Sequence, residues 1–103
     1  MRMIKKLSEE IKGNINEARS KIGEAYKLRD KDKAAAEWYR DMAAAHLRFN
    51  EAGHQNVTRL IHEAKTKMEG NPMMPGMLAV YEDIHADIIK DNAEVQAMIQ
   101  NYK

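Results

Sequence analysis

Apolar residues recur every three or four positions along most of this chain, which is the spacing of one face of an α-helix. Residues 3–29 show the repeat most regularly. Its members are Ile4, Leu7, Ile11, Ile15, Ala18, Ile22 and Ala25. Ala, Glu, Lys and Met, which favour helices, are plentiful throughout the chain. This segment is therefore predicted to be a long amphipathic helix.

Two further segments have the same spacing. In residues 33–69 we expect a wide stripe to face the core, together with a parallel row beside it. The stripe is Ala35, Trp38, Met42, Ala45, Phe49, Gly53, Leu60, Ala64 and Met68, and the row is Ala43, Leu47, Val57 and Ile61. Residues 76–102 have a narrower stripe. It consists of Met77, Tyr81, Ile84, Ile88, Val95, Ile99 and Tyr102. A wide stripe suits a helix that contacts two neighbours at once.

The helix breaks set the order of the elements. Both prolines, Pro72 and Pro75, lie in the segment GNPMMPG, which ends one helix and begins the next. An unbroken helix over residues 3–69 would be about 100 Å long, so we expect a turn near Asp30–Asp32, where either aspartate can cap the next helix. The prediction is an all-α fold, an up-down-up three-helix bundle with helices at about 3–29, 33–69 and 76–102. It forms one domain over residues 1–103.

Composition excludes several classes of site. The 103 residues include no cysteine, so zinc–thiolate sites, disulfides and cysteine nucleophiles are absent. Charges interrupt the N-terminal segment MRMIKKLSEEIKG, and no stretch approaches the 18 or so apolar residues of a membrane span. We therefore expect a cytoplasmic protein that does not enter a membrane.

The net charge of +1 is unevenly distributed, because residues 1–33 hold ten Lys/Arg against six Asp/Glu and residues 71–103 hold two against five. Lys5, Lys12 and Arg19 recur every seven residues beside the first apolar seam. A basic row of this kind can bind nucleic acid. Interhelical ion pairs explain it more simply, so we do not expect nucleic-acid binding. The third segment offers the acidic partners Asp83, Asp87, Asp91 and Glu94.

Two Glu-x-x-His pairs, Glu51 with His54 and Glu82 with His85, are the clearest candidates for metal ligands. Together with the surrounding sequence AEWYRDMAAAHLRF, they resemble the ligand set of the ferritin-like di-iron family. That resemblance implies a carboxylate-rich metal site on four helices. Since this chain offers three, the site would have to be assembled by dimerisation.

The helical geometry favours ordinary helices over a metal site. At about 100° per residue, Glu51 lies about 180° and His54 about 120° from the stripe that contains Phe49, and Glu82 is similarly turned away from its own seam. We therefore expect no metal and no cofactor. The polar row His46, Asn50, His54, Thr58 and His62 follows an i+4 ridge, and we expect His46 to be partly buried and hydrogen-bonded.

No arrangement of residues indicates an enzyme. The only serines, Ser8 and Ser20, lie outside any Gly-x-Ser-x-Gly turn, and the helical glycines form no phosphate-binding loop. We expect a small protein–protein interaction module that self-associates or docks on a larger partner. Its expected contact residues lie at the two ends of the bundle, where three helices do not all overlap. They are Trp38, Tyr39, Met68, Met73, Met74 and Met77.

Overall fold

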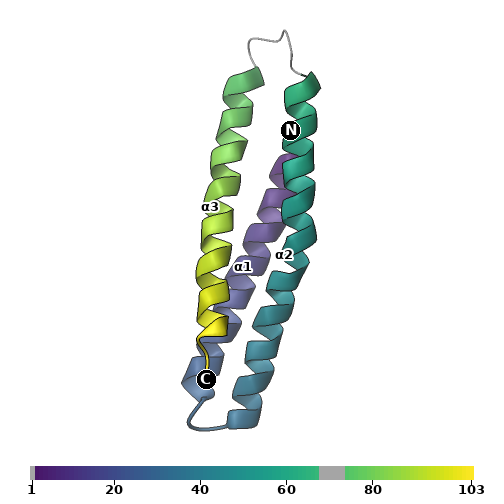
Figure 1. Ribbon diagram of the computed structural model, residues 1–103. Helices are drawn as coiled ribbons and strands as arrows, with labels where there is room; N and C mark the ends of the chain where they lie inside the picture. Colours follow the sequence, from purple (N-terminus) through teal and green to yellow (C-terminus); the bar gives the residue numbers. More distant parts are fainter. Residues whose placement is uncertain (1, 68–73) are drawn as a thin grey trace.

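The computed structural model describes residues 2–67 and 74–103, and it confirms the all-α, three-helix fold. The helices are α1 (Arg2–Leu28), α2 (Lys33–Lys67) and α3 (Met74–Gln100). They form a rod of 60 × 17 × 17 Å in which α2 runs antiparallel to both α1 and α3 (Figure 1). No helix among the described residues combines the length and the apolar character that crossing a membrane requires.

The turn between α1 and α2 lies where the sequence predicted it, and Asp32 caps α2. The Oδ1 atom of Asp32 accepts a hydrogen bond of 3.1 Å from the backbone N–H of Ala35, which no backbone carbonyl within the helix satisfies. At the other side of the turn, the carbonyl of Leu28 accepts the N–H groups of Lys31 and Asp32 at 2.9 and 2.8 Å. These bonds end α1 and begin α2 within four residues.

The core follows the predicted seam of α1 and adds one row from each of the other helices. Ile4, Ile15 and Ile22 have at most 2% of their surface exposed. Near the C-terminal end of α3, the rings of Tyr26 and Tyr102 meet edge-to-face at 5.3 Å, and the Tyr26 hydroxyl donates to the carbonyl of Met98 at 2.9 Å. This cluster fixes the end of α3 against α1.

The prediction for the core face of α2 is correct for the parallel row and wrong for Trp38 and Phe49 of the main stripe. The structure buries the parallel row, with Asn50 included, and leaves Trp38 and Phe49 of the main stripe 61% and 72% exposed. Apolar residues cover so much of this helix that it cannot bury them all between two neighbours. The side with the small residues Ala36 and Ala43 allows the closest packing, and both are fully buried.

On α3 the buried positions also differ in part from the predicted stripe. Ile88, Val95 and Tyr102 are buried as expected, whereas Met77 and Ile84 are 50% and 40% exposed. Leu78 and His85 lie in the core in their place. Among the proposed contact residues, Met68 and Met73 fall outside the described residues.

Gly53 lets α1 approach α2 closely. A Cβ atom at this position would lie 2.9 Å from Cγ1 and 3.1 Å from Cδ1 of Ile11, closer than carbon atoms normally pack. At Gly13 and Gly23 a Cβ atom would meet nothing within 4 Å.

We expect Gly53→Ala to lower the free energy of unfolding by about 1 kcal/mol, because the displacement of Ile11 outweighs the gain in helix propensity. Gly13→Ala and Gly23→Ala gain the same propensity without a clash. Each should therefore raise the free energy of unfolding by about 0.5–1 kcal/mol in urea titrations. Equal stabilisation by all three substitutions would show that α1 and α2 are not held this close at Ile11.

Candidate functional site

A layer of three asparagines joins all three helices in the core. Asn50, which is 1% exposed, accepts a hydrogen bond of 3.2 Å from Asn14 on α1 and donates one of 3.0 Å to Asn92 on α3. Its amide also lies 3.4 Å from the carbonyl oxygen of Ile11. Nδ1 of His46 lies 3.5 Å from Oδ1 of Asn14, and the His46 side chain is half-buried. The prediction of a partly buried, hydrogen-bonded histidine is therefore confirmed. The layer leaves little freedom for Asn50 to move.

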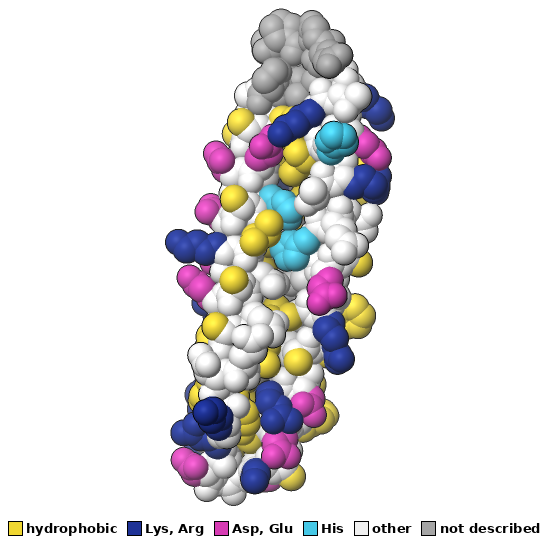
Figure 2. Space-filling model, in the orientation of Figure 1, with side chains coloured by type: hydrophobic (Ala, Val, Ile, Leu, Met, Phe, Trp, Pro, Cys, Tyr) yellow, Lys and Arg dark blue, Asp and Glu magenta, His cyan; other side chains and the backbone are white. Residues whose placement is uncertain are grey.

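One turn further along α2, His54 pairs with His85 of α3. Nδ1 of His54 and Nε2 of His85 are 3.1 Å apart, so one ring donates its N–H to the other. Histidine side chains gather between α2 and α3 on the face shown in Figure 2. Nε2 of His54 is buried and has no hydrogen-bond partner among the described residues. The expectation that His54 lies far from the core face is therefore wrong, because the buried row of α2 passes through it.

Burial keeps this pair uncharged. The loss of water around the ring lowers the pKa of His54 below its ordinary value. The side chain of Asn92, which is near the ring but outside normal hydrogen-bond geometry, opposes that effect in part. Burial also lowers the pKa of His85, and a charge on His54 lowers it further. Near neutral pH both rings are neutral, which is the state in which one can donate to the other.

The four candidate metal ligands do not come together in one chain. His54 and His85 are in contact, but Glu51 is exposed, and Glu82 forms an ion pair of 3.1 Å with Lys65. Within residues 2–67 and 74–103, no group of three or more His, Cys, Asp or Glu side chains is arranged to bind a metal ion. As ligands for a metal ion, His54 and His85 therefore supply two nitrogen atoms, and no carboxylate joins them.

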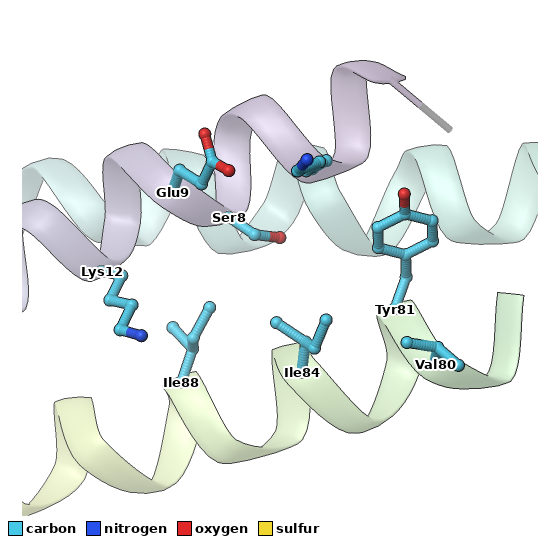
Figure 3. A pocket seen from close by; sticks show the side chains of 8 residues that line it. Ser8, Glu9, Lys12, Val80, Tyr81, Ile84 and Ile88 are labelled. Carbon is cyan, nitrogen blue, oxygen red and sulfur yellow. The ribbon is translucent and has the colours of Figure 1, made fainter. Parts of the chain in front are cut away.

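A groove of about 420 Å³ lies between α1 and the first half of α3. Ile84 and Val80 of α3 form its apolar side, and the Ser8 hydroxyl points into it from α1 (Figure 3). This hydroxyl is buried and has no hydrogen-bond partner among the described residues. Lys5 and Lys12 line the α1 side of the groove.

The ion pairs expected between α1 and α3 are not formed. Every ion pair in the described part of the chain lies within one helix or turn, except the Lys65–Glu82 pair between α2 and α3. Lys5 and Lys12 stand at the groove, and Asp83 and Asp87 are exposed on α3. The two charged rows are therefore separated by the apolar residues that line the groove.

The largest exposed apolar side chains in the described part of the chain lie on α2. Trp38 and Phe49 are eleven residues apart, or three helical turns, so they project from the same side of α2. Met42 and Ala45, both half-buried, lie between them on the same side. We refer to Trp38, Met42, Ala45 and Phe49 as the outer face of α2.

Tyr39 borders the outer face and belongs partly to the fold. Its ring lies 5.4 Å from that of Trp38 and is approached by the ammonium group of Lys21 at 6.0 Å. Of the contact residues expected from the sequence, Trp38 is exposed, Tyr39 is half-buried and Met77 is 50% exposed. The side chain of Met74 lies outside what the structure describes. Phe49 was missed because the sequence placed it in the core.

Comparison with protein-family models, with curated proteins and with solved structures gave no match to this chain.

Proposed function

We propose that this chain is a small helical protein–protein interaction module whose contact surface is the outer face of α2. One observation carries the proposal: Trp38 and Phe49 stay 61% and 72% exposed on one face of one helix. Large aromatic side chains are the commonest residues to dominate binding energy at protein interfaces, and contiguous exposed apolar surface is uncommon on a monomer.

The position of this face supports the proposal. Trp38 and Phe49 are not part of the core, which the isoleucines of α1, the parallel row of α2 and the buried residues of α3 fill. They therefore contribute little to the packing of the core, and their exposure leaves apolar surface free to be buried by a partner. A rigid helix also presents its side chains in fixed positions, so little conformational entropy is lost on binding.

Binding is tested by using the chain as bait in an extract of its source organism, comparing the wild type with Phe49→Lys and Trp38→Ala. We expect each substitution to reduce the amount of protein captured from the extract at least tenfold, while helix content measured by circular dichroism stays unchanged. Thr58→Lys is the matched control. Thr58 is an exposed residue on α2 that lies about 180° around the helix from Phe49, and its substitution adds the same charge as Phe49→Lys.

Loss of helix content in Trp38→Ala or Phe49→Lys would show that these side chains stabilise the fold rather than bind a partner. Unchanged binding by both variants would assign the contact to another surface. Either result contradicts the proposed role of the outer face.

The alternative function is metal binding. Of its four candidate ligands, only His54 and His85 are in contact within one chain. This alternative predicts near-stoichiometric iron or manganese in protein purified without chelator, and loss of that metal in Glu51→Ala with His54→Ala. Metal that survives this double substitution would be bound elsewhere.

A further inference from the structure

We propose that the partner of the outer face is a second copy of this chain, with the two α2 helices antiparallel about a two-fold axis. This inference rests on the proposed function and names its partner. In this arrangement Trp38 of each copy packs beside Phe49 of the other.

The spacing of the outer face matches this pairing. Its four residues follow one another at intervals of four, three and four positions, which read the same in both directions. An antiparallel copy therefore places an aromatic ring opposite an aromatic ring at each end. At the centre, Met42 of one copy meets Ala45 of the other, so the longer side chain faces the smaller one. A two-fold interface requires a surface that is complementary to itself, and this one is.

Charges along one edge of the face favour the antiparallel direction. Asp41 and Arg48 are seven residues apart, so they project in nearly the same direction, within about 20°, beside the outer face. Antiparallel pairing places Asp41 of each copy near Arg48 of the other. In a parallel pair, each edge of the outer face would instead meet the opposite edge of the partner's face, so Asp41 and Arg48 would lie near Tyr39 and His46 and gain no opposite charge.

Both charged residues are free to make these contacts. Arg48 is exposed and has no ion-pair partner in the described part of the chain. Asp41 is bonded to its neighbour Arg40 at 3.1 Å, but its side chain is 70% exposed. An exposed pair of this kind contributes little and is readily exchanged for another.

The contact spans about three helical turns of each copy, or about 16 Å. Such an interface lies near or below the lower end of the range of about 1,200–2,000 Å² for stable complexes. We therefore expect a dissociation constant in the micromolar range, about 1–100 μM, and weaker association at high salt. The dimer should form and dissociate readily.

Sedimentation equilibrium over a concentration series at low salt tests the pairing, and the emission of Trp38, the only tryptophan in the chain, reports burial of the outer face. We expect the wild type to dimerise with a blue shift of that emission. Asp41→Lys alone and Arg48→Glu alone should each weaken dimerisation by about tenfold or more, because each puts like charges together. Both residues are exposed, so neither change should alter helix content.

The decisive sample is an equimolar mixture of Asp41→Lys and Arg48→Glu. In an antiparallel heterodimer the new lysine faces the new glutamate, and the remaining Arg48 faces the remaining Asp41. We expect the mixture, and also the double variant, to associate within about threefold of the wild type. Thr58→Lys should dimerise as the wild type does, because Thr58 is exposed and lies about 180° around α2 from Phe49, away from the pairing.

A wild type that stays monomeric at all concentrations would overturn the second-copy inference. A dimer whose dissociation constant is unchanged by Asp41→Lys would also overturn it, because such a dimer would form at another surface. If that monomer still captures a protein from extract and Phe49→Lys abolishes the capture, the outer face serves a different protein and the proposed function stands. If Phe49→Lys changes neither binding nor dimerisation, both proposals fail.

Discussion

Asn50→Ala is expected to lower the free energy of unfolding by about 2–4 kcal/mol, one of the largest effects of any single substitution in this chain. The side chain is 1% exposed and bonds to Asn14 at 3.2 Å and to Asn92 at 3.0 Å. Truncation removes a hydrogen-bond partner from each of these two half-buried amides and opens a cavity. The cost of leaving a buried polar group unsatisfied is about 1–3 kcal/mol, and the cavity adds to it.

Urea denaturation followed by circular dichroism measures this change, with Asn16→Ala as the matched control. Asn16 is an exposed asparagine on α1, so its removal should change stability by less than about 0.5 kcal/mol. A loss at Asn50 no greater than that at Asn16 would show that the asparagine layer contributes nothing to stability.

Acidification below about pH 6.5 is expected to destabilise the fold through His54 and His85. Burial lowers the pKa of both residues in the folded state, whereas the unfolded chain keeps the ordinary value of 6.5. Above that pH both states are neutral at these rings, and their contribution to stability is complete. As the pH falls below 6.5, the unfolded chain binds protons first, so stability is lost progressively until the folded-state pKa values are passed.

Thermal unfolding between pH 8 and pH 5 measures this effect. We expect the melting temperature of the wild type to fall across the range, and His54→Leu with His85→Leu to remove much of the slope, because no buried imidazole then remains to be protonated. His62→Gln is the control, since His62 is exposed on the same helix. An unchanged slope in the double variant would assign the acid sensitivity to other groups.

The helices and their ends were predictable because they depend on local features. The seven-residue spacing of isoleucine and alanine defines α1, and a capping aspartate defines the start of α2. The choice of the buried face of α2 was not local. Trp38 and Phe49 belong to the more apolar row, yet α1 and α3 pack on the neighbouring row, where Ala36 and Ala43 allow close approach. Periodicity gives the rows of a helix but not which row its neighbours cover.

The same limit explains the histidines. The i+4 row through His46, Asn50 and His54 was visible in the sequence, and so was His85, but their meeting depends on how α3 is rotated against α2. A row that mixes apolar and polar residues can face either the core or the solvent, and this holds for the rows of both helices. Only their packing shows that Asn50 and Asn92 share a hydrogen bond and that His54 reaches His85.

The asparagine layer also determines how far α3 can slide along its neighbours. The buried positions of α3 recur in heptads from Leu78 to Tyr102, so a shift of one heptad, about 10 Å, would again bring mostly apolar residues to the core. It would also carry Asn92 away from Asn50 and break the hydrogen bond between them. A polar layer thus excludes shifted alignments that the apolar repeat alone would tolerate. One alignment of the three helices is selected, and with it one set of outward-facing residues.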